Sequence, residues 1–309
     1  MKLLINFFCI VLFMLSCHPD STQHPAEPHR LTVSILPQKY FVNRIAGNRW
    51  KVNVMIPPGH NPATYEPTAL QMKSLTGSSI YFRIGYIPFE LVWMKNLINL
   101  NPKMKVVDTS AGIRLIRGHH HTHHESGGHR LSGSKGVDPH IWLSPKSIKI
   151  VANHIYRSLK EIDPAHQSFY LDNYRGFLQE IDQLDREISQ VMRPVAGKKF
   201  LAYHPAWSYF ARDYGLIQIS IESEGKNPKP ADFRKVIDTA RAEGIRFIIV
   251  QRQFDTHSAE TIMNEINGRV IRLDPLDEDW TANLKKIARQ FKSLLLEKQD
   301  FNHHENQIR

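Results

Sequence analysis

Two kinds of histidine stand out along the chain, one isolated beside turns and the other crowded into one polar run. The isolated residues are His60, His140 and His204, and each has proline or glycine beside it. Asp274 adds a carboxylate after the short strand-like segment 270–273. Neutral imidazole and carboxylate are ligands that suit zinc in tetrahedral geometry. These four side chains are therefore candidates for a single cation site.

The segments before these residues predict a way to bring them together. Predicted strands at residues 50–56, 200–203 and 270–273 come shortly before His60, His204 and Asp274. Ligands of open α/β sheets bind outside the carboxyl ends of the strands. Scattered positions alone do not establish a site, however, because an isolated histidine is often a hydrogen-bonded turn residue.

Strand-like and helix-like segments alternate in both halves of the chain, which predicts the α/β class. Predicted strands lie at 31–36, 50–56, 80–84, 105–107, 200–203, 217–221, 247–250 and 270–273, with Pro37 ending the first. Predicted helices lie at 40–46, 68–75, 89–100, around Tyr209, and at 232–242, 258–266 and 280–296. A helix from 164 to 192 would span about 40 Å. We expect two lobes of parallel sheet flanked by helices and joined by this one long, rigid backbone helix.

The expected organisation follows from these segments and from composition. It comprises a signal peptide at 1–16, a lipidated tether at 17–30, an N-terminal α/β lobe at 31–145, a linking helical segment at 146–193, a C-terminal α/β lobe at 194–296 and a polar tail at 297–309. The first lobe would contain a His-rich loop at 117–136.

The first residues have the pattern of an export signal. Lys2 precedes an apolar run at 3–15, and Ser16 precedes Cys17, as in a bacterial lipoprotein signal cleaved before the cysteine. Cys17 is therefore the predicted lipidation site. Cys9 would leave with the signal, so the mature domains would hold no disulfide. The alternative is an ordinary signal peptide or an uncleaved anchor.

The formal net charge of +10 could indicate an anionic partner. The chain contains no dense block of Lys and Arg and no nucleic-acid motif, and it carries an export signal. We therefore expect no nucleic-acid partner, and a solvated basic surface near a membrane instead.

The crowded histidines lie in a polar run without apolar periodicity, which predicts a loop. They are His119, His120, His121, His123, His124 and His129. Neutral imidazoles bind zinc, so this loop is a candidate for a weak accessory metal site. The alternative is a solvated insertion without a role.

Five motifs occur in a fixed order along the chain. They are Pro-Pro-Gly at 57–59 with Thr-Tyr-Glu-Pro at 64–67, Asp-Pro-His-Ile-Trp-Leu-Ser-Pro at 138–145, the run 204–216 that begins His-Pro-Ala-Trp, the segment 222–228, and Leu-Asp-Pro-Leu at 273–276. Together they resemble the zinc and manganese solute-binding proteins of bacterial ABC uptake systems, a family that includes lipoprotein adhesins. The resemblance covers residues 31–296.

The resemblance implies two lobes bridged by a rigid helix, with the metal in the cleft. By position, His140, His204 and Asp274 match three family ligands, and a histidine at 204 favours zinc over manganese. The fourth ligand position of the family is occupied here by Ala63. Either His60 reaches the metal, water completes the site, or Glu66 contributes. Glu222 is a further alternative or outer-sphere residue.

The implied function is capture of zinc outside the cytoplasm and its delivery to an ABC permease, without catalysis. We expect a monomeric, membrane-anchored lipoprotein in the periplasm or at the cell surface. Two other classes remain open. A zinc hydrolase would also use histidine ligands, although the chain has no His-Glu-x-x-His motif. A metal-binding adhesin-type lipoprotein is the other alternative.

Overall fold

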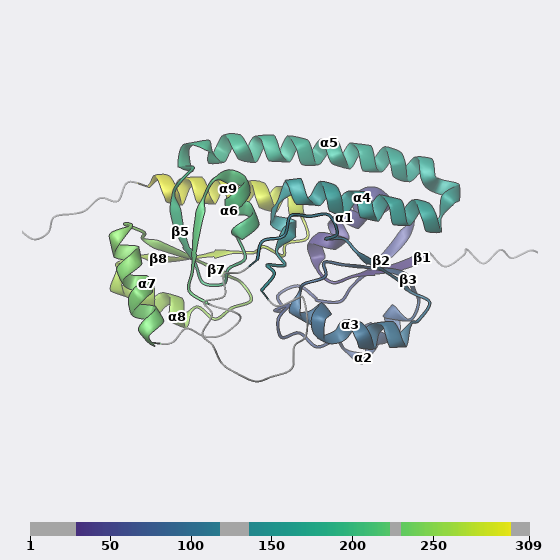
Figure 1. Ribbon diagram of the computed structural model, residues 1–309, viewed down its shortest axis with the longest axis horizontal. Helices are drawn as coiled ribbons and strands as arrows, with labels where there is room; N and C mark the ends of the chain where they lie inside the picture. Colours follow the sequence, from purple (N-terminus) through teal and green to yellow (C-terminus); the bar gives the residue numbers. More distant parts are fainter. Residues whose placement is uncertain (1–28, 118–135, 223–229, 298–309) are drawn as a thin grey trace, which may run out of the picture.

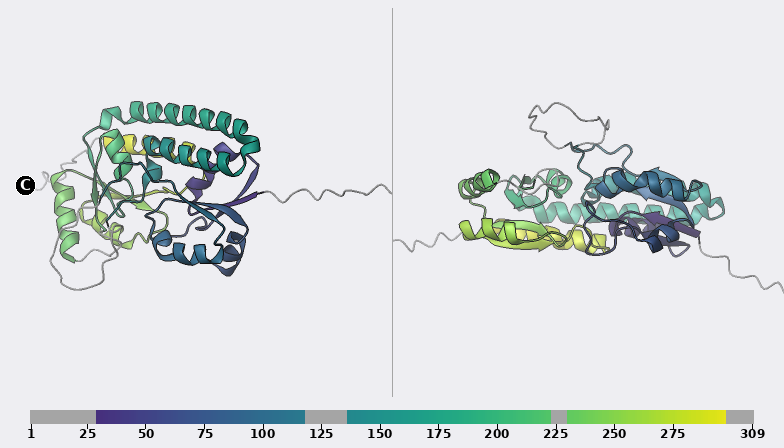
Figure 2. Two further views of the ribbon diagram at one scale, coloured as in Figure 1. Left: turned by 45° about the vertical axis from the view of Figure 1, so that its right-hand side comes forward. Right: turned by 90° about the horizontal axis from the view of Figure 1, so that it is seen from below.

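The computed structural model describes residues 29–117, 136–222 and 230–297. In these residues two sheets lie in separate lobes, and a long helix runs past both (Figure 1). Seen from below, this helix lies behind the two lobes (Figure 2). The predicted architecture of two α/β lobes on one backbone helix is confirmed.

The first lobe is built on four parallel strands in the order β2-β1-β3-β4. The strands are β1 (His29–Val33), β2 (Trp50–Val54), β3 (Ser78–Arg83) and β4 (Lys105–Asp108). Helices α1 (Leu36–Ala46), α2 (Ala69–Leu75) and α3 (Pro88–Leu100) connect them. The carboxyl ends of β1 and β3 adjoin, because Val33 is paired with Phe82.

The second lobe repeats this topology with the order β6-β5-β7-β8, again all parallel. Its strands are β5 (Lys199–Ala202), β6 (Ile217–Ser220), β7 (Phe247–Gln251) and β8 (Arg269–Leu273). Its helices are α6 (Ser208–Tyr214), α7 (Pro230–Ala242), α8 (His257–Glu265) and α9 (Trp280–Leu296). Every residue of β7 is buried, as expected of an apolar strand inside a parallel sheet.

Two helices join the lobes, α4 (Pro145–Ile162) and the 26-residue α5 (Gln167–Met192). The buried side chains of α5 recur every three to four residues or at multiples of that spacing, which gives the helix one apolar face. They are Tyr170, Phe177, Ile181, Leu184, Ile188 and Met192. This face packs against α1 of the first lobe, against α9 of the second lobe and against the neighbouring helix α4. One helix therefore supports both lobes.

Aromatic side chains bind the two lobes into a common core. The rings of Phe41 in α1 and Trp280 in α9 are 5.1 Å apart, and both contact Phe177 of α5. Among the described residues, none of the helices has the length and apolar character that a membrane crossing requires.

The start of the first helix differs from the sequence prediction. The prediction placed a strand at 31–36 and a helix at 40–46, but β1 ends at Val33 and α1 begins at Leu36. Pro37 therefore lies in the first helical turn, where a missing N–H removes no helical hydrogen bond. The Gln38 carboxamide oxygen accepts the backbone N–H groups of Ser34 and Ile35 and so satisfies the chain at this junction.

Candidate metal centre

His204 stands directly beyond the carboxyl end of β5. Its Nδ1 is 2.8 Å from Oε2 of Glu222, which follows the neighbouring strand β6. The two backbones run in register here, since the Glu222 amide donates to the Tyr203 carbonyl. The ring of Phe254, from the segment after β7, stacks on the imidazole at 4.9 Å. Three adjacent strand ends thus fix the orientation of His204.

His140 is positioned by its own short loop. Oδ1 of Asp138 accepts hydrogen bonds from both the backbone N–H of His140 (2.9 Å) and its Nδ1 (2.7 Å). An aspartate side chain commonly forms such a local turn by accepting the backbone N–H of the residue two positions later in the chain. His140 is buried, and burial lowers the pKa of its imidazole despite the nearby carboxylate. The side chain is therefore held neutral, which is the state that binds metals.

The structure brings these two histidines together. Their ring centroids lie 5.2 Å apart at an interplanar angle of 72°. Because Nδ1 of each ring bonds a carboxylate, Nδ1 carries the proton and Nε2 is the nitrogen that presents a lone pair. Two imidazoles backed by carboxylates are the usual arrangement around a bound metal.

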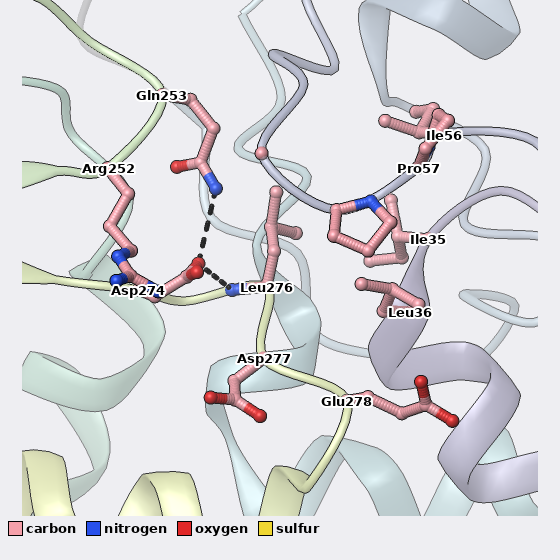
Figure 3. Close-up of a pocket in the computed structure, with 12 residues that line it drawn as sticks. Ile35, Leu36, Ile56, Pro57, Arg252, Gln253, Asp274, Leu276, Asp277 and Glu278 are labelled. Atoms are coloured by element: carbon pink, nitrogen blue, oxygen red, sulfur yellow. Dashed lines mark hydrogen bonds between the residues drawn. The ribbon is translucent and has the colours of Figure 1, made fainter.

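Asp274 follows β8 and lies at a cleft of about 230 Å³ between the lobes. One carboxylate oxygen accepts the Leu276 backbone N–H (2.9 Å) and the Gln253 side-chain amide (3.2 Å). Figure 3 shows both bonds, with Ile56 and Pro57 of the first lobe across the cleft. The carboxylate is thus held at the inter-lobe surface.

His60 and Glu66 are exposed. Nδ1 of His60 is 3.1 Å from the Pro58 carbonyl, and its ring meets Tyr65 edge-on at 5.1 Å. Among the described residues, no three His, Cys, Asp or Glu side chains form a group that could hold a metal ion. The conformation therefore assembles the His140–His204 pair but not a complete four-ligand set. Cys17 and the six crowded histidines lie outside the described residues.

Sequence reasoning assigned no role to Asp138, Gln253 or Phe254. Asp138 could have been found from the Asp-Pro-His run, because aspartate two residues before a histidine forms such turns. Gln253 and Phe254 carry no such signal, since their contacts depend on neighbouring strand ends.

Fold and site together define a class. Two lobes of the same parallel topology direct strand ends toward one cleft, a helix supports both, and paired imidazoles lie at the carboxyl end of a sheet. This is the arrangement of a two-lobed solute-binding protein with a metal as its solute.

Comparisons with known proteins identify the family. The profile of the family described as "Zinc-uptake complex component A periplasmic" matches residues 31–294, and the chain belongs to this family. Its members are solute-binding subunits of zinc ABC transport systems and not enzymes, so the predicted class is confirmed and the hydrolase alternative is not supported.

Relatives and solved structures agree with this assignment. A "Putative metal-binding protein" of Chlamydia trachomatis serovar D is 29% identical over 92% of this chain and 98% of its own length. The "High-affinity zinc uptake system protein ZnuA" of Bacillus subtilis is 23% identical over 86% of this chain and 85% of its own length. A crystal structure of ZnuA is 37% identical, with a TM-score of 0.79 over 87% of this chain and all of that chain.

Proposed function

We propose that this protein captures one zinc ion in the cleft between its lobes and delivers it to an ABC permease. His140 and His204 would bind the ion through Nε2, and Asp274 would supply a carboxylate. The observation that supports this most strongly is the pair of imidazoles 5.2 Å apart, each with Nδ1 bonded to a carboxylate.

Zinc is the preferred cargo because the assembled ligands are nitrogen donors. Imidazole suits zinc, whereas manganese favours carboxylate, carbonyl and water oxygens. A ZnuA structure that is 37% identical is described as having zinc bound. The FpvC protein of Pseudomonas aeruginosa, 22% identical, is described in complexes with Mn²⁺ and Ni²⁺, and this distant likeness extends to the fold alone.

The remaining ligand would come from the first lobe. His60 lies in the loop after β2, close to residues 57–59, which line the cleft opposite Asp274. It is exposed, and its side-chain hydrogen bond is to the nearby Pro58 carbonyl, so reorientation would break little. Water or Glu66 are the alternatives.

The surroundings of the protein are also part of the proposal. Cys17 would carry a lipid that holds the chain at the outer side of a membrane, next to its permease. The protein would act as a monomer, and the six histidines at 119–129 would form a weak accessory zinc site. Membership of the family supports an extracytoplasmic location and a permease partner. The lipid at Cys17, the monomeric state and the accessory zinc site are part of the proposal alone.

Calorimetric zinc titration tests the proposal. All variants would carry serine at the six crowded histidines, so that the cleft site alone is measured. We expect one tight site in this background and its loss in His140→Ala and in His204→Ala. His154→Ala is the control, because His154 contacts the carbonyl of Ala111 and lies outside the cleft site.

Each outcome has a distinct meaning. If His60→Ala also loses the tight site, His60 is supported as the fourth ligand in place of the position occupied by Ala63. If zinc affinity is unchanged in His60→Ala, water or Glu66 is favoured as the fourth ligand. A tight site that survives His140→Ala would contradict the proposal.

A further inference from the structure

The segment that carries His140 is bonded to the second lobe on both sides. Two residues before it, the Asp138 carbonyl accepts the hydroxyl of Tyr209 from α6 at 3.0 Å. Two residues after it, Trp142 donates to the Pro275 carbonyl at 2.9 Å and accepts from Trp280 at 2.7 Å. His140 is therefore held by the lobe that also carries His204 and Asp274.

The Tyr209 hydroxyl makes two backbone contacts at once. It accepts the Ile116 N–H at 3.0 Å while it donates to Asp138. These two residues also bond each other directly, since the Asp138 N–H donates to the Ile116 carbonyl at 2.9 Å. Tyr209 is fully buried, and burial raises its pKa to about 12, so the hydroxyl keeps the proton it donates.

Arg212, on the next turn of α6, strengthens this contact. Its guanidinium lies 5.0 Å from the Tyr209 ring centroid, within cation–π range. It also donates to the Arg114 carbonyl at 3.1 Å. Tyr209 and Arg212 thus both bond the segment at 114–116, and Tyr209 alone also bonds the segment that carries Asp138.

Helix α6 also follows directly on the segment that carries His204. The Ala206 N–H bonds the His204 carbonyl at 2.8 Å, and the Trp207 N–H bonds Gln218 of β6 at 2.8 Å. The turn after His204 is thereby fixed to the start of α6. The turn that leads into α6 therefore fixes His204, and α6 itself holds the segment of His140 through the Tyr209 hydroxyl.

We propose that Tyr209 is a positioning residue for metal binding, whose hydroxyl sets the separation of the His140 and His204 imidazoles by holding Asp138. The two imidazoles then form a half-site that is assembled before the metal arrives, and the first lobe adds its ligand afterwards. This inference rests on the proposed function, since it concerns the same cleft.

Tyr209→Phe tests the inference, with Tyr214→Phe as its matched control. Tyr214 is a buried tyrosine of the same helix, and its hydroxyl donates to Asp185 of α5 at 2.9 Å, away from His140. Zinc affinity would be measured by competition with a chelator, and site geometry by the visible spectrum of the cobalt-substituted protein. Unfolding of both metal-free variants would report any loss of stability.

We expect Tyr209→Phe to weaken zinc binding about tenfold, as loss of outer-sphere support does in metal sites, and to alter the cobalt spectrum. Tyr214→Phe should lose stability but keep the wild-type affinity and spectrum. If Tyr209→Phe does not fold, Arg212→Gln replaces it, with an expected loss of about threefold in affinity, because it removes the cation–π contact with Tyr209 while the hydroxyl remains.

Failure of the two proposals can be told apart. A wild-type protein without a tight zinc site would overturn the proposed function itself. The positioning role alone would be overturned if the wild type has a tight zinc site and Tyr209→Phe keeps the same affinity and cobalt spectrum. The same holds for Arg212→Gln where that variant is used.

Discussion

Each of the two paired histidines is bonded to a carboxylate that fixes its tautomer. Asp138 holds Nδ1 of His140, and Glu222 holds Nδ1 of His204. Such partners raise the basicity of the opposite nitrogen and orient the ring toward a cation. Since burial keeps His140 neutral, protons compete weakly with the metal for its Nε2 near neutral pH.

Asp138→Asn should therefore weaken zinc binding about tenfold, within the range seen when outer-sphere partners of metal ligands are removed. The amide still accepts a hydrogen bond but lacks the charge that supports the imidazole. Chelator competition measures the change.

Asp163→Asn provides the control for this substitution. Asp163 also bonds a histidine, since its Oδ1 lies 2.8 Å from Nδ1 of His166, but at the turn between α4 and α5. Its replacement should leave zinc affinity unchanged. Equal affinities in wild type and Asp138→Asn would show that the carboxylate does not support a metal ligand.

At the scale of the elements, the first lobe has a buried carboxylate where β1 and β3 end. Glu90, in the first turn of α3, accepts the backbone N–H groups of Ile84 (2.9 Å) and Gly85 (2.5 Å) and the hydroxyl of Ser34. Burial raises the pKa of Glu90 to about 7, although these hydrogen bonds oppose the shift. The network closes the carboxyl end of the first sheet.

This pKa predicts how stability changes with pH. The unfolded chain releases the Glu90 proton near its ordinary pKa of 4.5, whereas the folded protein retains it to about pH 7. The contribution of Glu90 to stability is thus fully present below pH 4.5 and is lost as pH rises to 7. The total loss is about 3 kcal/mol at most.

Glu90→Gln should remove this dependence, because glutamine does not ionise. Chemical denaturation of both proteins between pH 4.5 and 7.5 should show the wild type losing stability relative to the variant. Glu161→Gln is the control, since Lys105 lowers the pKa of Glu161, which therefore stays charged across most of this window. Parallel curves for wild type and Glu90→Gln would refute the shifted pKa.

The alternation of elements was predictable from sequence because each strand and helix has its own local pattern. The closing helix matches its predicted bounds, 280–296. The start of α1 was missed because Pro37 is equally compatible with ending a strand and with beginning a helix. The Glu90 network could not be predicted, since it joins the ends of two strands to a helix that follows the second.

The candidate site was predictable in part. Its histidines stand out by type and by the turns beside them, and the pairing of strand ends brings His204 to Glu222. The attachment of His140 to the second lobe could not be predicted, because it depends on hydrogen bonds to Tyr209 and Trp280 far along the chain. The role of His60 remains a prediction.

At the scale of the whole molecule, the two lobes are fixed to α5 by polar as well as apolar contacts. The Tyr40 hydroxyl of α1 donates to Glu180 of α5 at 2.5 Å and lies 2.9 Å from the Thr281 hydroxyl of α9. Thr281 also donates to Glu180 at 2.9 Å. One side chain from each of three helices therefore meets at the junction of the lobes.

Tyr40→Phe should lower the free energy of unfolding by about 1–2 kcal/mol, because it removes a hydrogen bond to a partly buried carboxylate. Urea denaturation measures this change. Tyr156→Phe is the control, since Tyr156 stacks on the Tyr174 ring at 4.8 Å and the substitution preserves that stack. A loss no larger than that of the control would show that the junction contributes little.

The continuous α5 also predicts small lobe movement on metal binding. A helix without a break is a poor hinge, and the ring contact between Phe41 of α1 and Trp280 of α9 joins the lobes directly. Small-angle scattering should show a change in radius of gyration of no more than about 1 Å when zinc is added, as in other preorganised binding proteins. A larger compaction would indicate hinged closure.

The most direct measurement is anomalous diffraction at the zinc absorption edge from crystals of the zinc-loaded protein. We predict a single strong peak in the cleft, within about 2.0–2.1 Å of Nε2 of both His140 and His204. A strongest peak elsewhere, or a cleft peak that contacts neither imidazole, would contradict the proposal that this pair is the centre of the zinc site.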